Sequence, residues 1–357
     1  MDDQRIQDIQ AIRESAAAVA PRDGTLQRVR ELRFTSPGFD LAIWRQMAAL
    51  GWLGLRLPEN QGGVAMGLME SIALHEELGR GLVPEPLIAG SLAAQALALT
   101  TEHDLLERVI AGESLVALAW QEKPDEMEIC SGLAESRLFV PMAGAADFFL
   151  VPVAKDGDIR LILFDAGELS LLLHQQQDGT TVATVHFPAH RGRPVSADMR
   201  EQLASALDEA ALTMAAYLLG LAERAFEITL DYLKQRQQFG QPLAAFQALQ
   251  HRAADLMIQL TLTRASVEDA AAEVEKQVDS ASRSLAISRA KARASDTALL
   301  VTREAVQMHG AIGWADECDI GLFVRKALVT ANEYGSALAH RNRFGQLAVA
   351  THRLPQA

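Results

Sequence analysis

Hydrophobic residues recur at intervals of three and four through residues 1–113, the spacing that places them on one face of a helix. Gly51, Gly62–Gly63 and Pro84–Glu85–Pro86 interrupt this pattern where helices are expected to end. We therefore predict an N-terminal helical domain over residues 1–113. The runs that carry the pattern are IQDIQAIRESAAAVA, FDLAIWRQMAAL, MESIALHEELGRGL and LIAGSLAAQALALT.

The period changes between residues 114 and 196. Short β-prone runs follow one another there, and Gly, Asp and Pro separate them. Few helices fit between such closely spaced runs, so we predict a small middle β domain over residues 114–196. The runs are SLVALAW, SRLFVPM, DFFLVPVA, IRLILFD, LSLLLHQ and TVATVHF.

Helical spacing returns from residue 197 to the end of the chain. Long blocks rich in Ala and Leu, joined by short connections, favour an antiparallel four-helix bundle over residues 197–357. The predicted fold class is therefore α+β and mainly α, with helical, β and helical domains in that order. The four blocks cover residues 200–236, 243–276, 281–309 and 318–350.

Composition indicates a globular protein with a substantial core, since 49% of its 357 residues are hydrophobic and 22% are charged. The net charge of −13, without a dense Lys/Arg cluster, argues against nucleic acid as a partner. The acidic start MDDQRIQDIQ does not resemble a signal peptide, and the apolar run at residues 210–222 is shorter than the ~20 residues of a membrane span. We expect a cytoplasmic protein that does not insert into membranes.

The two cysteines, Cys130 and Cys318, stand alone in the sequence. Neither has a second Cys or a His at the spacing that zinc sites use, and two distant cysteines do not form a disulfide framework. We expect no metal site, and we expect both cysteines to act as small buried apolar residues.

Three stretches carry a resemblance to the acyl-CoA dehydrogenase family, and it extends over nearly the whole chain. They are LGWLGLRLPENQGGVAMGLMESIALHEELGRGLVPEP, LDYLKQRQQFGQPLAAFQALQ and AVQMHGAIGW. The resemblance implies FAD as cofactor, α,β-dehydrogenation of an acyl-CoA thioester as reaction, and an electron-transfer flavoprotein as acceptor of the electrons. Because family members share a flavin site between chains, it also implies an oligomer.

The resemblance further implies which residues contact FAD. A guanidinium suits phosphate oxygens, and an aromatic ring suits a planar cofactor. The alternative for the bend after residue 235 is structural: Arg236 as a helix-end cation, Phe239 as a core residue and Gly240 as a helix C-cap. The implied cofactor residues are Arg236, Gln238, Phe239, Gln247, Gln307, His309, Gly310, Gly313 and Ser336.

The catalytic glutamate of the family is displaced in this sequence. In RKALVTANEYGSALAHR, aligned on Arg325 and Gly335, the position of the base holds Tyr334, whose phenol has an ordinary pKa near ~10 and is a poor base at neutral pH. Glu333 lies one residue earlier and is the candidate base. Some family members place the base instead on the first helix of the C-terminal bundle. At that position this sequence has Ala210, and Glu209 is again one residue away.

These departures favour a subunit of a heteromeric acyl-CoA dehydrogenase, such as those of bacterial steroid degradation, in which a homologous partner completes the flavin site. The middle region also lacks the Gly-Ser-Asp stretch that covers the flavin ring in typical members. Two alternatives stay open: a self-sufficient homomeric dehydrogenase that uses Glu333, and a non-catalytic scaffold subunit that binds no flavin. A related flavin monooxygenase or oxidase is a further alternative, because a fold does not fix its chemistry.

Overall fold

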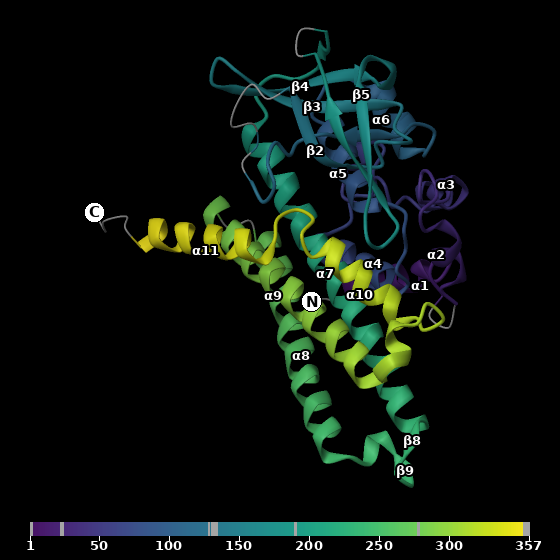
Figure 1. Cartoon of the computed structure of the whole chain (residues 1–357). Coiled ribbons are helices and arrows are strands. Elements are labelled where there is room, and N and C mark those ends of the chain that lie inside the picture. Colours follow the sequence, from purple (N-terminus) through teal and green to yellow (C-terminus); the bar gives the residue numbers. More distant parts are fainter. Residues whose placement is uncertain are drawn as a thin grey trace. The chain divides into compact units, whose positions relative to one another are not determined.

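The computed structural model describes residues 3–21, 25–127, 129, 135–188, 191–276 and 279–352. The chain forms two compact units, and each is assembled from separate stretches of sequence (Figure 1). Unit 1 contains residues 1–26, 72–83 and 211–357. Unit 2 contains residues 27–71 and 84–210.

Unit 1 is a bundle of long helices in which α9 packs against α8, α10 and α11. A short β-hairpin joins α7 to α8, and Figure 1 shows it at the lower end of these two helices. The elements are α1 (Asp3–Ala16), most of α4 (Leu68–Arg80), most of α7 (Arg200–Gln235), β8 (Gln237–Gln238), β9 (Gln241–Pro242), η3 (Leu243–Ala245), α8 (Gln247–Glu275), α9 (Ser280–His309), η4 (Gly310–Trp314), α10 (Ile320–Thr330) and α11 (Ala337–His352); the first residues of α4 and α7 belong to unit 2.

The sequence of α9 explains its place at the centre of the bundle. Asp279 caps its first turn by accepting the backbone N–H groups of Ala281 and Ser282, each at 3.0 Å. Alanines at 286, 290, 294 and 298 form a buried stripe of small side chains, which lets neighbouring helices approach closely. The helix ends where Gly310 takes a φ of 69°.

The fourth predicted block, residues 318–350, is two helices rather than one. A turn at residues 331–336 separates α10 from α11, because Tyr334 and Gly335 take φ values of 55° and 98° that no α-helix contains. Helical spacing on both sides of this turn concealed the break in the sequence. The other three blocks correspond to α7, α8 and α9.

In its described residues, unit 2 holds two small β-sheets, with strand orders β1-β3-β4-β7 and β2-β6-β5. All neighbouring strands are antiparallel except β1 and β3. Its elements are α2 (Gln27–Leu32), α3 (Leu41–Ala49), η1 (Glu59–Gln61), α5 (Leu87–Leu97), α6 (His103–Ile110), β1 (Val116–Leu118), β2 (Ser136–Pro141), β3 (Phe148–Lys155), β4 (Asp158–Asp165), η2 (Ala166–Glu168), β5 (Ser170–Gln175), β6 (Thr181–His186) and β7 (Arg193–Pro194).

The core of unit 2 combines alternating strand residues with one buried ion pair. On β4 buried and less buried residues alternate, as expected for a strand with one covered face. Arg137 pairs with Glu122 at 3.0 Å, both almost fully buried, and its guanidinium lies over the ring of Phe187 at 5.0 Å. Arg137 also donates to the carbonyl of Pro152 at 2.8 Å. This arginine joins β2 to β3, two strands that belong to different sheets.

Two expectations from composition can be compared with this structure. Cys318 is a free, half-buried thiol, and Cys130 lies outside the described residues. In the described parts of the chain, no helix combines the length and the apolar character that crossing a lipid bilayer requires.

Candidate flavin site and base

In the hairpin between α7 and α8, Phe239 has a left-handed backbone conformation and an exposed side chain. Phe239 and Gly240 are its two central residues, with φ values of 54° and 80°, the pattern of a tight type I′ turn. Glycine adopts this conformation freely, whereas phenylalanine rarely does. The Phe239 side chain is 91% exposed, and its ring is edge-on to that of Phe246, with 6.2 Å between the ring centroids. Phe239 is therefore no core residue, and Gly240 is part of a hairpin rather than a helix C-cap.

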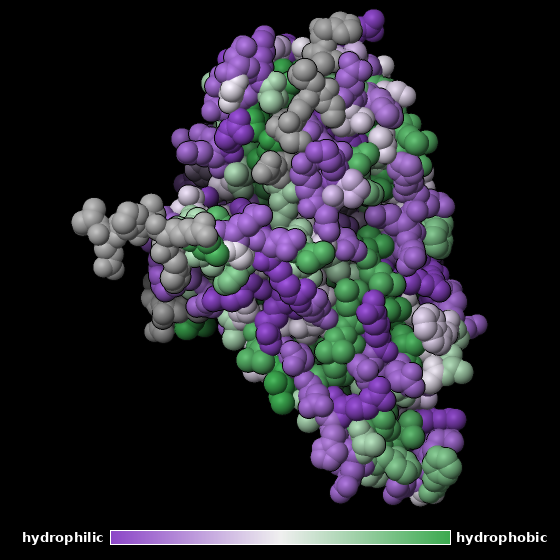
Figure 2. Space-filling view, turned by 60° about the vertical axis from the view of Figure 1, so that its left-hand side comes forward, coloured by the Kyte–Doolittle hydropathy of each residue, from purple (hydrophilic) through white to green (hydrophobic). Residues whose placement is uncertain are grey.

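Polar side chains surround Phe239 on this hairpin. Arg236, Gln238 and Gln247 are all exposed. The carbonyl of Arg236 accepts the N–H of Leu243 at 2.8 Å, so the backbone of the hairpin is fixed while these side chains face solvent. Figure 2 shows hydrophobic surface among hydrophilic side chains at the lower end of the molecule, where Figure 1 places the hairpin.

The C-terminal end of α9 is fastened to the end of α7 by His309. Its ring is buried and stacks on Tyr232 at 4.3 Å, and the Tyr232 hydroxyl donates to the His309 carbonyl at 3.3 Å. Because its Nδ1 lies 2.8 Å from the carbonyl of Ala305, Nδ1 carries a proton and donates there. Burial lowers the pKa of His309 below its ordinary value, which favours the neutral ring. This imidazole supports the helix end rather than facing solvent.

The glycines after α9 have different roles. A Cβ on Gly313 would lie 2.9 Å from the carbonyl oxygen of Val306, so only glycine lets η4 pack onto α9. Gly310 is exposed with a φ of 69°, and its missing side chain would point into open space. Near it, Ile312 and Trp314 are 52% and 72% exposed. The turn therefore offers open backbone and apolar side chains at one surface.

Eight of the nine implied cofactor residues lie at one end of the bundle, because the Tyr232–His309 stack and the hairpin hold the ends of α7 and α9 and the start of α8 together. An exposed guanidinium, exposed amides, a bare aromatic ring and a glycine turn fit a ligand that has phosphates and a planar ring. We call this set the bundle-end cluster; its members are Arg236, Gln238, Phe239, Gln247, Gln307, His309, Gly310 and Gly313.

The ninth residue, Ser336, lies far from the other eight. Its hydroxyl accepts the N–H of Ala339 at 3.2 Å and so caps α11. The turn that contains it is bonded to Lys291 of α9, whose Nζ lies 3.0 Å from the carbonyl of Gly335. Eighteen residues of α9 separate Lys291 from His309, which corresponds to about 27 Å along the helix axis. Within one chain the cofactor residues therefore form two separate groups.

The turn at residues 331–336 also contains the candidate base. Burial raises the pKa of the Tyr334 phenol well above its ordinary value, and the charge of Glu333 adds to the rise. The phenol consequently stays protonated at neutral pH, so Tyr334 is a hydrogen-bond donor rather than a base. Glu333 is half-buried in the turn that ends α10.

Glu209 is held in an ion pair within unit 2. Both of its carboxylate oxygens accept hydrogen bonds from Arg56, each at 3.2 Å. Arg56 also donates to the carbonyl of Met66 at 2.7 Å, which fixes the guanidinium in place. In this structure Glu209 is therefore an ion-paired carboxylate.

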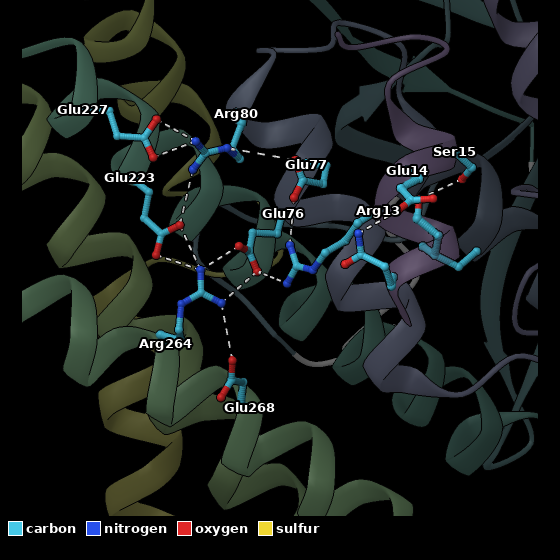
Figure 3. Close-up of polar contacts among 12 residues, drawn as sticks. Arg13, Glu14, Ser15, Glu76, Glu77, Arg80, Glu223, Glu227, Arg264 and Glu268 are labelled. Carbon is cyan, nitrogen blue, oxygen red and sulfur yellow. Dashed lines mark hydrogen bonds and ion pairs between the residues drawn. The ribbon is translucent and has the colours of Figure 1, made fainter. Parts of the chain in front are cut away.

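The sequence HEELGR on α4 builds a network of arginines and glutamates in unit 1 (Figure 3). Arg264 of α8 bonds Glu76 at 2.6 Å and Glu223 of α7 at 2.7 Å. Arg13 of α1 bonds Glu76 from another side at 2.9 Å, and Arg80 reaches Glu223 at 3.5 Å. This network ties four helices together, so its charged residues have a structural role.

The pKa values of two glutamates in the network shift in opposite directions. Burial opposes ionisation of Glu76, but hydrogen bonds and charges from Arg264 and Arg13 outweigh it and hold its pKa below the ordinary value. For Glu223 burial prevails: together with the nearby charge of Glu76, it raises the pKa despite Arg264. Close helix packing explains the burial, since a Cβ on Gly220 would lie 1.9 Å from the carbonyl oxygen of Glu76.

Comparison with known proteins shows the family. Residues 7–112 match the family described as acyl-CoA dehydrogenase, N-terminal domain, and residues 201–346 match acyl-CoA dehydrogenase, C-terminal domain. Acyl-CoA dehydrogenase IpdE2 of Mycolicibacterium smegmatis is 30% identical over 339 residues, which cover 91% of this chain and 93% of that protein. The chain belongs to the acyl-CoA dehydrogenase family.

Solved structures agree with this membership. The Tcur3481–Tcur3483 steroid ACAD has a chain that is 28% identical, with a TM-score of 0.88 over 98% of this chain and 100% of that one. The ChsE4–ChsE5 complex from Mycobacterium tuberculosis shares the fold, with 23% identity and a TM-score of 0.84 over 99% of both chains. The predicted acyl-CoA dehydrogenase fold, with its helical and small β regions, is confirmed.

Several residues that shape the site were missed by the sequence analysis. Tyr232 lies four residues before Arg236, inside a stretch that carries the family resemblance, but its partner His309 is 77 residues away. Lys291 gives no signal in the sequence, because a lysine on a helix is usually a surface residue. Only its complete burial identifies it.

Proposed function

We propose that this chain is one subunit of an FAD-dependent acyl-CoA dehydrogenase and that a homologous second chain completes its flavin site. The observation that carries the proposal is the separation of the bundle-end cluster from Ser336 along α9, by about 27 Å. A flavin shared between two chains needs such an arrangement, because one chain then supplies the bundle end and the other supplies the turn.

Each part of the bundle-end cluster has a role that its chemistry supports. FAD, when bound, accepts a hydride from the β-carbon of the acyl group. Arg236 can fork onto phosphate oxygens, and Gln238 and Gln247 can donate amide N–H groups beside it. Phe239 can cover a planar ring, which would reduce the 91% exposure of its side chain.

Removal of the α-proton is the step for which this chain offers the weakest support, because it requires a base. Tyr334 stays protonated because of its raised pKa, and Glu209 is bonded to Arg56 at 3.2 Å. We therefore infer that a carboxylate of the second chain acts as base. A self-sufficient enzyme would instead require the Glu333 carboxylate to reach the substrate within hydrogen-bonding distance.

The relatives suggest the class of substrate and the other partners. The 28% identical structure is a steroid ACAD, so a steroid-derived or similarly bulky acyl-CoA thioester is the substrate class that we propose. By family membership, an electron-transfer flavoprotein would reoxidise the flavin, and the cytoplasm is the expected compartment. Oligomerisation follows from the shared site.

The test compares the lone chain with the chain co-expressed with its homologous genomic neighbour. Flavin absorbance per chain and its bleaching by acyl-CoA are measured in both preparations. We expect both signals in the co-expressed complex and neither in the lone chain. Phe239→Ala should lower flavin content of the complex, whereas Phe34→Ala, at a 52% exposed phenylalanine of unit 2, is the matched control and should not.

The other outcomes point to specific alternatives. Stoichiometric flavin that acyl-CoA bleaches in the lone chain, with loss of bleaching in Glu333→Gln, would identify a homomeric dehydrogenase. No flavin in either preparation would identify a scaffold subunit. Rapid reaction of the reduced flavin with oxygen would indicate oxidase or monooxygenase chemistry.

A further inference from the structure

Side chains of α9 and α11 hold the turn at residues 331–336 by its carbonyl groups. Lys291 of α9 is 0% exposed, and its Nζ donates to the carbonyls of Ala331 and Gly335, each at 3.0 Å. The Lys291 Nζ also donates to the hydroxyl of Ser295, one helical turn away, at 3.0 Å. The Ser295 hydroxyl in turn donates to the carbonyl of Ala331 at 3.0 Å. Two side chains thus converge on one end of the turn.

A second contact comes from α11, on the other side of the turn. His340 is 0% exposed, and its Nε2 lies 2.9 Å from the carbonyl of Tyr334. Because a carbonyl oxygen only accepts, Nε2 carries the proton. The backbone N–H of His340 donates to the carbonyl of Ser336 at 3.1 Å, so the first turn of α11 is continuous with the held segment.

The backbone of the turn is in a conformation that needs such support. Tyr334 takes a φ of 55°, which is uncommon for an aromatic residue, and Gly335 takes a φ of 98°, which favours glycine. If the turn slipped by one residue so that Glu333 replaced Tyr334, Tyr334 would have to adopt the conformation of Gly335. The same slip would move the three carbonyls away from the buried donors of Lys291 and His340, which is unfavourable.

We propose that Lys291 and His340 are positioning residues that lock the register of the turn at residues 331–336, so that Tyr334 and not Glu333 precedes Gly335. We call the two side chains the turn clamp. The functional consequence rests on the proposed acyl-CoA dehydrogenase activity: the clamp keeps a proton-donating phenol, and excludes a carboxylate, at the place where family members carry their base.

Amide hydrogen exchange of the co-expressed complex tests the clamp without needing turnover. Lys291→Met and His340→Leu remove the donors, so the amides of Ala339 and His340, bonded to Ser336, should exchange at least about tenfold faster. His340→Gln keeps an amide donor and should restore most of the protection. Lys276→Met is the matched control, since the side chain of Lys276 is 64% exposed.

A spectroscopic titration reports on Tyr334 itself. Its phenol ionises late because burial raises its pKa, and the ultraviolet difference between wild type and Tyr334→Phe isolates its contribution from those of the other two tyrosines. In Lys291→Met the pKa should fall toward the ordinary tyrosine value as the turn opens.

The results separate the clamp from the proposed function. Unchanged exchange at Ala339 and His340, or an unchanged Tyr334 titration in Lys291→Met, would overturn the clamp. If wild type lacks flavin and bleaching, the proposed function fails while the exchange data still decide the clamp. Should Lys291→Met not fold, the pair His340→Leu and His340→Gln, with Ser295→Ala, answers the same question.

Discussion

Removal of Arg264 provides the strictest test of the structural role assigned to the arginine–glutamate network. In Arg264→Met, Glu76 and Glu223 lose contacts of 2.6 and 2.7 Å. Removing one partner of a buried ion pair lowers the free energy of unfolding by about 3–5 kcal/mol. The Arg264 side chain is 32% exposed, and Arg13 still bonds Glu76, so we expect a loss of about 2–3 kcal/mol in the free energy of unfolding.

This loss should depend on pH in a defined direction. The lowered pKa of Glu76 means that its contribution to stability is present above the unfolded-state value of 4.5 and is lost as pH falls through the folded-state value. Without Arg264, Glu76 and Glu223 repel each other, and both folded-state pKa values rise. The folded variant then binds more protons than the unfolded chain, so its stability rises as pH falls from 7 toward about 5.

Thermal unfolding of the full chain at pH 7 and pH 5 measures both effects. For a cooperative unit of 150–250 residues each 1 kcal/mol shifts Tm by about 2–4 °C, so Arg264→Met should lower Tm by about 4–12 °C at pH 7 and by less at pH 5. Arg252→Met is the control, because Arg252 pairs with Glu304 at the surface and should contribute at most about 1 kcal/mol. Equal shifts in both variants, or a shift that is larger at pH 5, would refute the reasoning.

Three further substitutions test other parts of the structure. Gly220→Ala should destabilise by about 1–3 kcal/mol in thermal unfolding, because the added methyl group would lie 1.9 Å from a backbone oxygen of α4, whereas Gly345→Ala on α11, with open space around it, should be neutral or slightly stabilising. Phe239→Ala should change the unfolding free energy of the isolated chain by less than about 0.5 kcal/mol, since the side chain is 91% exposed; a larger loss would mean that the ring is structural. Arg137→Met should cost about 3–5 kcal/mol in denaturant unfolding, because it leaves the buried carboxylate of Glu122 without its cation, and a loss below about 1 kcal/mol would contradict this account.

The sequence predicts the long helices of this protein well and their interruptions poorly. Spacing of apolar residues marks α7, α8 and α9, because each helix buries a continuous stripe. The turn between α10 and α11 escapes this method, since Gly335 is its only local signal and the stripe continues on both sides. Lys291, which holds the turn, is recognisable only from its burial.

For the candidate site, too, the sequence predicts the arrangement of residues that are close together in the chain but not that of residues far apart. The hairpin after α7 is local, so its motif alone indicates that Arg236, Gln238 and Phe239 lie near one another. The gathering of Gln307 and Gly310 at the same end depends on the Tyr232–His309 stack, a contact between residues far apart in the chain. Roles for Glu333 and Ser336 stay predictions, because they depend on a second chain and a cofactor.

The arginine–glutamate network also constrains how the protein is made. Glu76 leaves the ribosome about 190 residues before Arg264, which corresponds to roughly 10–40 s at ~5–20 residues per second. During that interval α4 carries a carboxylate that has no burial site to enter until α7 and α8 have been synthesised. The N-terminal stretches of unit 1, residues 1–26 and 72–83, must therefore wait for the C-terminal half of the chain, and a fragment that ends before α8 would not reproduce their folded state.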